Sequence, residues 1–184
     1  DKGFDAVVGN PPYGASLLSE EKTFILAEFD WQSYQLDSYL VFLEQSLRHL
    51  LRPKGYVGVI IPNPWLTNLR QNRFRKRVFE NSRVLEIIHF TFNVFKRAKA
   101  TVDTQIVLIQ NGATKQFKPT SYIVSEIGST DSIDLTLSKK ILHDQDSWTA
   151  NPDLPVNIFM GADERKLATK MRAVGTQLTM LFNS

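Results

Sequence analysis

The chain of 184 residues is 42% hydrophobic and 22% charged, with a net charge of +3, values typical of a globular protein large enough to bury one core. It has no cysteine, which excludes disulfides and thiolate metal sites, and its three histidines lie far apart in the sequence, so we predict no metal site. No apolar run reaches the roughly 20 residues of a membrane span, and the first residues do not resemble a signal peptide. We therefore expect a cytoplasmic protein with no membrane partner.

The first elements in chain order are a strand, a loop and two helices. Residues 4–9 form a short apolar run that predicts a buried parallel strand. In residues 10–14, two prolines and a glycine exclude regular structure. A short helix is predicted over residues 20–29. A longer helix is predicted over residues 37–51, where large apolar residues recur at helical spacing, and residues 52–55 supply the breakers that end it.

Three further strands are predicted, over residues 56–61, 84–90 and 104–110. A basic amphipathic helix over residues 69–80 follows the first of them, with Phe74 and Val78 turned inward. The last two strands are joined by a basic, aromatic loop and not by a helix, so we expect them to pair antiparallel at a sheet edge. The alternation of strands and helices predicts part of a doubly wound α/β sheet.

The composition changes after residue 111. Residues 116–126 have the pattern of one or two strands, residues 128–155 are polar and irregular, and residues 163–174 predict a helix. We therefore divide the chain into an α/β part, residues 1–111, and a connector toward another domain, residues 112–184. Because the first strand has no earlier strand to pair with, we expect the protein to continue beyond both ends, and the exposed sheet edge to favour self-association.

The loop after the first strand has the chemistry of an amine-binding site. The side-chain oxygen of Asn10 is a neutral acceptor that suits an exocyclic amine. Pro11 and Pro12 lack N–H groups, so their backbone offers only carbonyl acceptors, held at fixed φ. Tyr13 supplies a flat face for a planar ring. The carboxyl end of a strand is where α/β sheets bind ligands, so we favour this interpretation over that of an ordinary turn.

Residues 70–99 carry a local net charge of +7, which leaves −4 for the rest of the chain. Such a cluster indicates a polyanionic partner, although a solvated helix face is the alternative. Aromatic residues interleaved with basic ones suit an extrahelical base with its flanking phosphates. We accordingly predict substrate contacts from the basic residues Arg73, Lys76, Lys96 and Arg97. Phe95, in the same basic loop, suits stacking on such a base, but in a chain with twelve phenylalanines the residue type alone favours a place in the core.

The run FDAVVGNPPYG from Phe4 to Gly14 resembles motif IV of the S-adenosylmethionine-dependent adenine-N6 DNA methyltransferases. The order of the elements that follow is similar to that of the family, and the segment from Phe92 to Val107 resembles its motif VIII. The likeness is to the gamma-type, TaqI-like enzymes, above all to the methylase part of bacterial type II restriction–modification proteins. It covers roughly residues 1–110 and implies the C-terminal half of a doubly wound, Rossmann-like methyltransferase sheet.

The resemblance implies that Asn10, Pro11, Pro12 and Tyr13 are catalytic and that Phe95 stacks on an adenine flipped out of double-stranded DNA, with Phe92 as the alternative stacking residue. Phe42, in the segment that matches motif V, would pack near the cofactor, or else serve the helix core. The family's glycine-rich cofactor loop is absent from this chain. We therefore expect the isolated chain to be inactive and to bind S-adenosylmethionine weakly or not at all.

Three alternatives stay open from the residues alone. Methyltransferases that act on a glutamine of release factors share the Asn-Pro-Pro-Tyr motif, and RNA adenine or guanine methyltransferases are a closer rival. The chain could also be a non-catalytic scaffold that contacts DNA.

Overall fold

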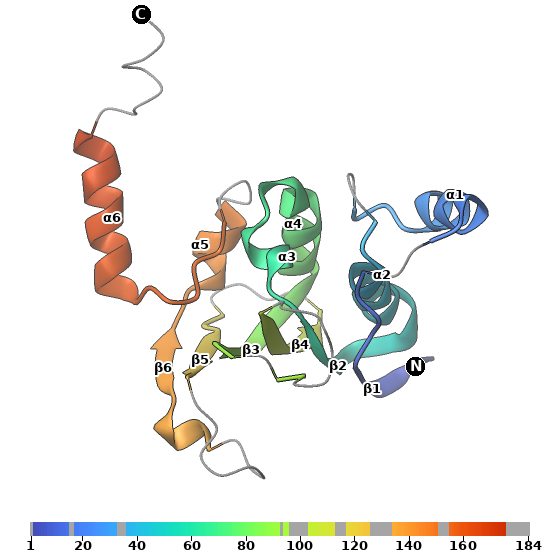
Figure 1. The fold of residues 1–184 in the computed structure, drawn as a ribbon, viewed down its shortest axis with the longest axis horizontal. Helices are drawn as coiled ribbons and strands as arrows, with labels where there is room; N and C mark the ends of the chain where they lie inside the picture. Colours follow the sequence, from blue (N-terminus) through green and yellow to red (C-terminus); the bar gives the residue numbers. More distant parts are fainter. Residues whose placement is uncertain are drawn as a thin grey trace, which may run out of the picture.

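The computed structural model is an α/β structure built on a mixed sheet, and it describes residues 2–14, 17–32, 36–92, 94–95, 103–112, 117–125, 134–150 and 155–175. Its strands are β1 (Phe4–Gly9), β2 (Leu51–Pro62), β3 (Ser82–Phe90), β4 (Thr104–Asn111), β5 (Thr120–Val124) and β6 (Lys139–Leu142). Its helices are α1 (Ser19–Glu28), α2 (Ser38–Gln45), α3 (Pro64–Thr67), α4 (Asn72–Asn81), α5 (Gln145–Ala150) and α6 (Ala162–Val174). A π-helical turn, η1 (Ser46–Leu50), and two 3-10 turns, η2 (Leu69–Gln71) and η3 (Leu135–Leu137), complete these elements (Figure 1).

The strand order is β1-β2-β4-β3-β5-β6. β1 pairs parallel with β2, and β4 pairs antiparallel with both β2 and β3, so that Val107 lies between Val59 and Ile87. The predicted antiparallel pairing of the strands around residues 84–90 and 104–110 is confirmed. Their predicted place at a sheet edge is wrong, because β5 pairs parallel with the outer side of β3 and β6 pairs with β5.

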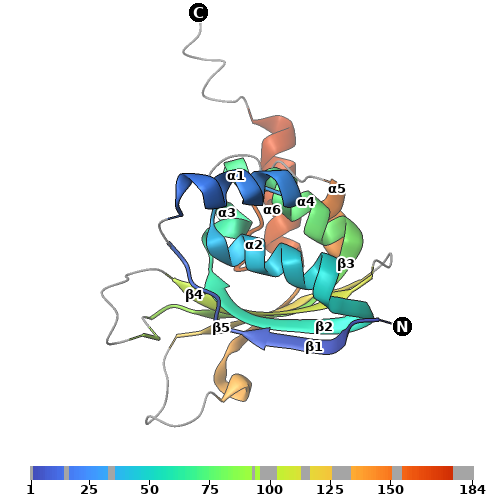
Figure 2. The ribbon, with the colours of Figure 1, turned by 90° about the vertical axis from the view of Figure 1, so that its right-hand side faces the viewer.

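Most of the core lies between the sheet and α2 to α5, which Figure 2 shows on the same side of the sheet as α1. On α4, Phe74 and Val78 are fully buried, as the amphipathic pattern predicted. The helix predicted over residues 37–51 is present as α2 followed by η1. Residues 52–55, which were predicted to end this helix, lie within β2. There the register of the pairing with β1 shifts between Phe4 and Ala6, and Lys54 has a φ of 66°. The breakers therefore make a bulge in the strand.

The first strand, predicted as buried, is mostly exposed: Phe4 and Val8 are 62% and 84% exposed. β1 lies at the edge of the described sheet. The helices in Figure 2 cover the face of the sheet opposite to the one that carries Phe4 and Val8. Val7 faces the helices and packs against the core. The apolar run therefore predicted the strand correctly, but not its surroundings.

The described residues of the second part of the chain pack on the same sheet, and the predicted division of the chain after residue 111 stays a prediction. β5 and β6 extend the sheet, and Trp148, Val156 and Ile158 join the main core cluster. The polar pattern of residues 128–155 concealed β6 and α5, which are short and bury few apolar side chains. The helix predicted over residues 163–174 is α6. Whether it leads to a recognition domain stays a prediction. Within the described ranges, no helix combines the length and apolar character needed to cross a bilayer.

Candidate active site at the carboxyl end of the first strand

The Asn-Pro-Pro-Tyr loop begins where β1 ends. Asn10 and Pro12 are exposed, Pro11 is buried and Tyr13 is half-buried. Gly14 has a φ of 69°, in the left-handed region that favours glycine, and the chain turns away there. The loop thus presents the Asn10 amide and the Tyr13 ring beside a backbone anchored by a buried proline.

Helix α2 supports this loop at two places. The Ser38 hydroxyl donates a hydrogen bond of 2.5 Å to the Pro12 carbonyl. One turn later, the Phe42 ring packs on Gly9, so closely that a Cβ added to Gly9 would lie 3.3 Å from Phe42 Cζ. Phe42 is half-buried and also packs against the core. It therefore belongs both to the helix core and to the base of the loop.

The two aromatic rings predicted to hold a base lie close together. The Tyr13 and Phe95 ring centroids are 6.4 Å apart, with an interplanar angle of 48°. Phe92 instead packs on the buried Phe90, at 5.7 Å. This arrangement favours Phe95 over Phe92 as the stacking residue. A base held between two parallel rings needs them about 7 Å apart, twice the contact distance, so the pair would have to open slightly and flatten.

The Tyr13 phenol is set to stay neutral. Burial raises the pKa of Tyr13 above that of a free phenol. A free phenol is already uncharged near neutral pH, and this shift acts in the same direction, so the ring suits stacking on a neutral base.

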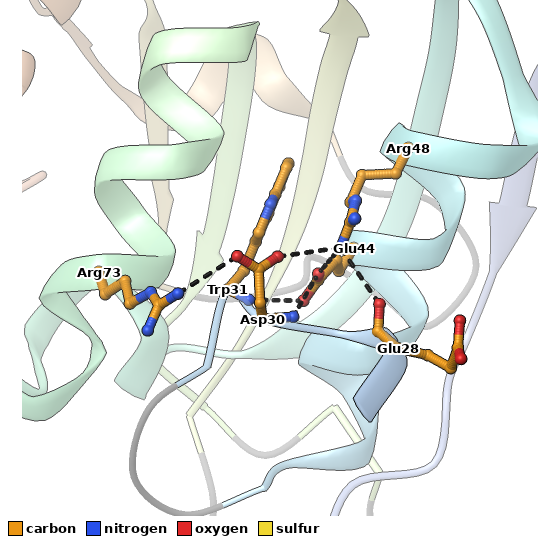
Figure 3. Close-up of polar contacts among 6 residues, drawn as sticks. All are labelled: Glu28, Asp30, Trp31, Glu44, Arg48 and Arg73. Carbon is orange, nitrogen blue, oxygen red and sulfur yellow. Dashed lines mark hydrogen bonds and ion pairs between the residues drawn. The ribbon is translucent and has the colours of Figure 1, made fainter. Parts of the chain in front are cut away.

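Of the predicted phosphate contacts, Arg73 is engaged within the protein. Its Nη2 atom lies 3.2 Å from Asp30 Oδ2, and Arg48 Nη1 lies 3.1 Å from Asp30 Oδ1 (Figure 3). The Arg73 side chain is 47% exposed. It can therefore reach solvent, but a phosphate would have to compete with Asp30.

Glu44 organises the polar network of Figure 3. Its side chain is fully buried and accepts hydrogen bonds from the backbone N–H groups of Asp30 and Trp31, at 3.1 and 3.2 Å, and from Arg48 at 2.5 Å. Burial raises the pKa of Glu44, and these hydrogen bonds oppose the rise. The network fastens residues 30–31 to α2 and, through Asp30, to α4.

The remaining basic residues differ in their surroundings. Lys76 is 54% exposed and lies 3.9 Å from Glu80, a weak surface ion pair. Arg75, in contrast, is fully buried and donates to the carbonyls of Trp65 and Asn68, at 3.1 and 2.5 Å. Arg75 therefore supports the fold and is no part of a DNA-facing surface. Lys96 and Arg97 lie outside the described residues.

Two features of the site were missed in the sequence. Ser38 and Glu44 lie on the predicted helix, but their partners are 26 and about 13 residues away in the chain. A polar residue on the buried face of a helix, as Glu44 is, was the available signal, since buried charges need partners. Among the residues that the structure describes, no three histidine, aspartate or glutamate side chains gather as a metal ion would require.

Known proteins resemble this chain in sequence. The family described as Eco57I restriction-modification methylase matches residues 1–95. A type II restriction enzyme and methyltransferase of Escherichia coli is 30% identical, over 75% of this chain and 16% of its own. A Methanocaldococcus jannaschii protein described in the same terms is 34% identical, over 62% of this chain and 9% of its own. The chain thus spans less than a fifth of the length of these curated relatives.

The fold is also found among solved structures. The methyltransferase subunit of a type I restriction-modification system from Streptococcus thermophilus is 16% identical, with a TM-score of 0.61, over 85% of this chain and 37% of that one. At this level of identity the likeness concerns the fold alone. It confirms the α/β, Rossmann-like methyltransferase fold class that the sequence predicted.

Proposed function

Because the chain belongs to the Eco57I restriction-modification methylase family, we propose that it forms the target-base half of an enzyme that methylates adenine N6 in DNA. The observation that carries the proposal is the Asn-Pro-Pro-Tyr loop at the end of β1, with Tyr13 beside Phe95 at 6.4 Å. Membership of a restriction-modification family favours DNA over RNA or a protein glutamine as the substrate. The chain matches only 9% and 16% of the length of its two curated relatives, which supports the proposal that it is part of a longer enzyme.

The chain's part in the reaction is to hold and orient the amine. The N6 lone pair of adenine is delocalised into the ring, which makes the amine a weak nucleophile. Hydrogen bonds from the two N6 hydrogens to the Asn10 side-chain oxygen and the Pro11 carbonyl favour a tetrahedral nitrogen, whose lone pair is then free to attack. As the N6–methyl bond forms, the nitrogen becomes positively charged and afterwards releases one proton to solvent. Both acceptors stabilise that developing charge.

The aromatic pair would receive the extrahelical base. Tyr13 and Phe95 rings separated to about 7 Å leave space for one planar ring between them. Stacking on both faces offsets part of the few kcal/mol that flipping costs. The observed separation of 6.4 Å is close to that spacing, so only a small opening of the pair would be required.

The cofactor proposed is S-adenosylmethionine, which when bound would supply an electrophilic methyl group, its S–CH3 bond breaking so that the sulfur leaves as a neutral thioether. Among the described residues, the feature that fits it is the half-buried Phe42 ring against the bare backbone of Gly9, a flat surface on which an adenine packs. Phe42 would thus hold part of the adenosine. The rest of the pocket is proposed to come from other parts of the longer enzyme.

The decisive experiment replaces Asn10 in the full-length enzyme. Asn10→Ala should lower the methylation rate by about 10²–10³-fold, the usual loss for one placed hydrogen-bond partner, and leave DNA binding nearly unchanged. Asn81→Ala is the matched control, because Asn81 lies at the far end of α4 and donates to the Arg77 carbonyl. Retention of more than about a tenth of the rate by Asn10→Ala would refute the role of the loop.

A second measurement concerns the isolated 184-residue chain. We expect no DNA methylation, and weak or absent binding of S-adenosylmethionine in a calorimetric titration. A dissociation constant in the low micromolar range would show a complete cofactor site within this chain and overturn the proposal that it is half of an enzyme.

A further inference from the structure

The Asn-Pro-Pro-Tyr loop has few backbone hydrogen-bond donors with which to anchor itself to the rest of the protein. Residues 11 and 12 are both proline, so neither offers a backbone N–H that could donate a hydrogen bond to the rest of the protein. Such a loop is fastened through its carbonyl oxygens, and this requires a donor from elsewhere. The Ser38 hydroxyl, at the first residue of α2, is such a donor and bonds to the Pro12 carbonyl at 2.5 Å.

The contacts of α2 lie on both sides of the two proposed amine acceptors. Ser38 and Phe42 are four residues apart, so they lie on one face of the helix. Phe42 packs on Gly9, immediately before Asn10, and Ser38 holds Pro12, immediately after Pro11. The buried Pro11 lies between these two points. A single rigid helix therefore fixes the backbone before and after the Asn10 side chain and the Pro11 carbonyl.

The geometry points to Ser38 as a positioning residue for methyl transfer, an inference that rests on the proposed function. Its hydrogen bond occupies the Pro12 carbonyl and leaves the Pro11 carbonyl for the substrate amine. It also sets the direction in which Tyr13 leaves the loop toward Phe95. Ser38 does not touch the reacting atoms. It acts through the loop that does.

The position of the bond separates this role from a merely structural one. Ser38 is only half-buried, so water replaces the lost partner in a variant and the stability cost is small. The catalytic cost is larger, because a displacement of the acceptors by a fraction of an ångström misaligns the attacking lone pair. Ser38→Ala should therefore lower the activity of the enzyme with little effect on its stability.

Ser82 provides a matched control. Its hydroxyl also donates to a backbone carbonyl at 2.5 Å, that of Val78, but at the start of β3, far along the chain from the loop. Ser82 is fully buried, so Ser82→Ala should cost at least as much stability as Ser38→Ala. A variant that only loosens the fold is thus available for comparison.

The test measures kcat, KM for DNA and Tm for the full-length enzyme and for its Ser38→Ala, Ser38→Thr and Ser82→Ala variants. We expect Ser38→Ala to lower kcat by about tenfold or more with KM and Tm little changed, Ser38→Thr to recover most of kcat, and Ser82→Ala to keep it. A kcat for Ser38→Ala within about twofold of the wild type, or an equal loss in Ser82→Ala, would overturn the inference. A wild-type enzyme that does not methylate DNA would instead refute the proposed function, and the inference with it.

Discussion

Gln145 offers the sharpest test of how the second part of the chain contributes to the fold. It is the first residue of α5 and 3% exposed. Its Oε1 accepts from the Val84 backbone N–H at 2.9 Å, and its Nε2 donates to the carbonyls of Phe79 and Ser82 at 3.0 and 2.7 Å. One side chain thus satisfies three backbone groups where α4 turns into β3. We predict that Gln145→Ala destabilises the protein severely.

The size of the effect follows from these contacts. The Val84 N–H lies beside a bulge, since the register with β4 shifts between Val84 and Glu86. An orphaned buried group costs about 1–3 kcal/mol, and the two carbonyls lose less because each has a second lone pair. With the space left by the side chain, the loss comes to roughly 3–5 kcal/mol. That is a large part of the about 5–15 kcal/mol that stabilises most domains.

Urea unfolding of the 184-residue chain measures this loss as a change in the free energy of unfolding. Gln110→Ala is the matched control on the same sheet, because the Gln110 Nε2 also donates two hydrogen bonds, to the Lys54 carbonyl and the Tyr56 hydroxyl, but at an exposed site. It should cost less than about 1 kcal/mol. A loss of that small size for Gln145→Ala would refute the assignment of α5 to the core.

Three further predictions concern pH, DNA and the loop. Burial and the neighbouring Arg165 lower the pKa of His143 to about 4. The neutral imidazole therefore contributes fully to stability above pH 6.5, the ordinary pKa of histidine, and this contribution is lost as the pH falls toward 4. In urea unfolding at a series of pH values, the free energy of unfolding of the wild type should fall by roughly 3 kcal/mol more than that of His143→Gln over this range. Lys76→Gln in the full-length enzyme should lower the slope of log K for DNA against log salt by about 1 without affecting Tm, whereas Arg75→Gln should lower Tm; equal slopes for Lys76→Gln and the wild type would assign that lysine to a solvated face. Gly9→Ala places a Cβ 3.3 Å from Phe42 Cζ, so kcat should fall several-fold while the free energy of unfolding changes by less than about 1 kcal/mol, and an unaltered kcat would show that the contact does not shape the loop.

The groups of the candidate site could be named from the sequence because they are neighbours in the chain. Asn10, Pro11, Pro12 and Tyr13 are consecutive, and the apolar run before them predicted the strand that carries them. The inward face of α4 and the extent of α2 with η1 followed from helical periodicity, a property of neighbours three and four residues apart. Such patterns report which side of an element is apolar, and here the burial of Phe74 and Val78 agrees.

The tertiary structure decided which faces of the strands and helices are buried and which partner each polar side chain binds. The pattern predicted a buried β1, but Val8 is 84% exposed because β1 lies at the edge of the described sheet. Arg75 looked like its basic neighbours on α4, yet it is buried on two carbonyls. β6 and α5 carried no clear pattern, because they are short and Gln145 contributes hydrogen bonds more than apolar area.

The site shows the same division between local and distant information. The sequence left Phe92 open as an alternative to Phe95, and the packing distinguishes the two residues. Phe92 lies on Phe90, whereas Phe95 lies beside Tyr13, which is far from it in the sequence. The bond between Ser38 and Pro12 joins residues 26 apart, and each partner alone is an ordinary helix start or loop carbonyl. Periodicity and motifs show which side chains a segment presents on each of its faces. The partner of each side chain comes from a segment far away in the sequence, and no local pattern encodes which segment that is.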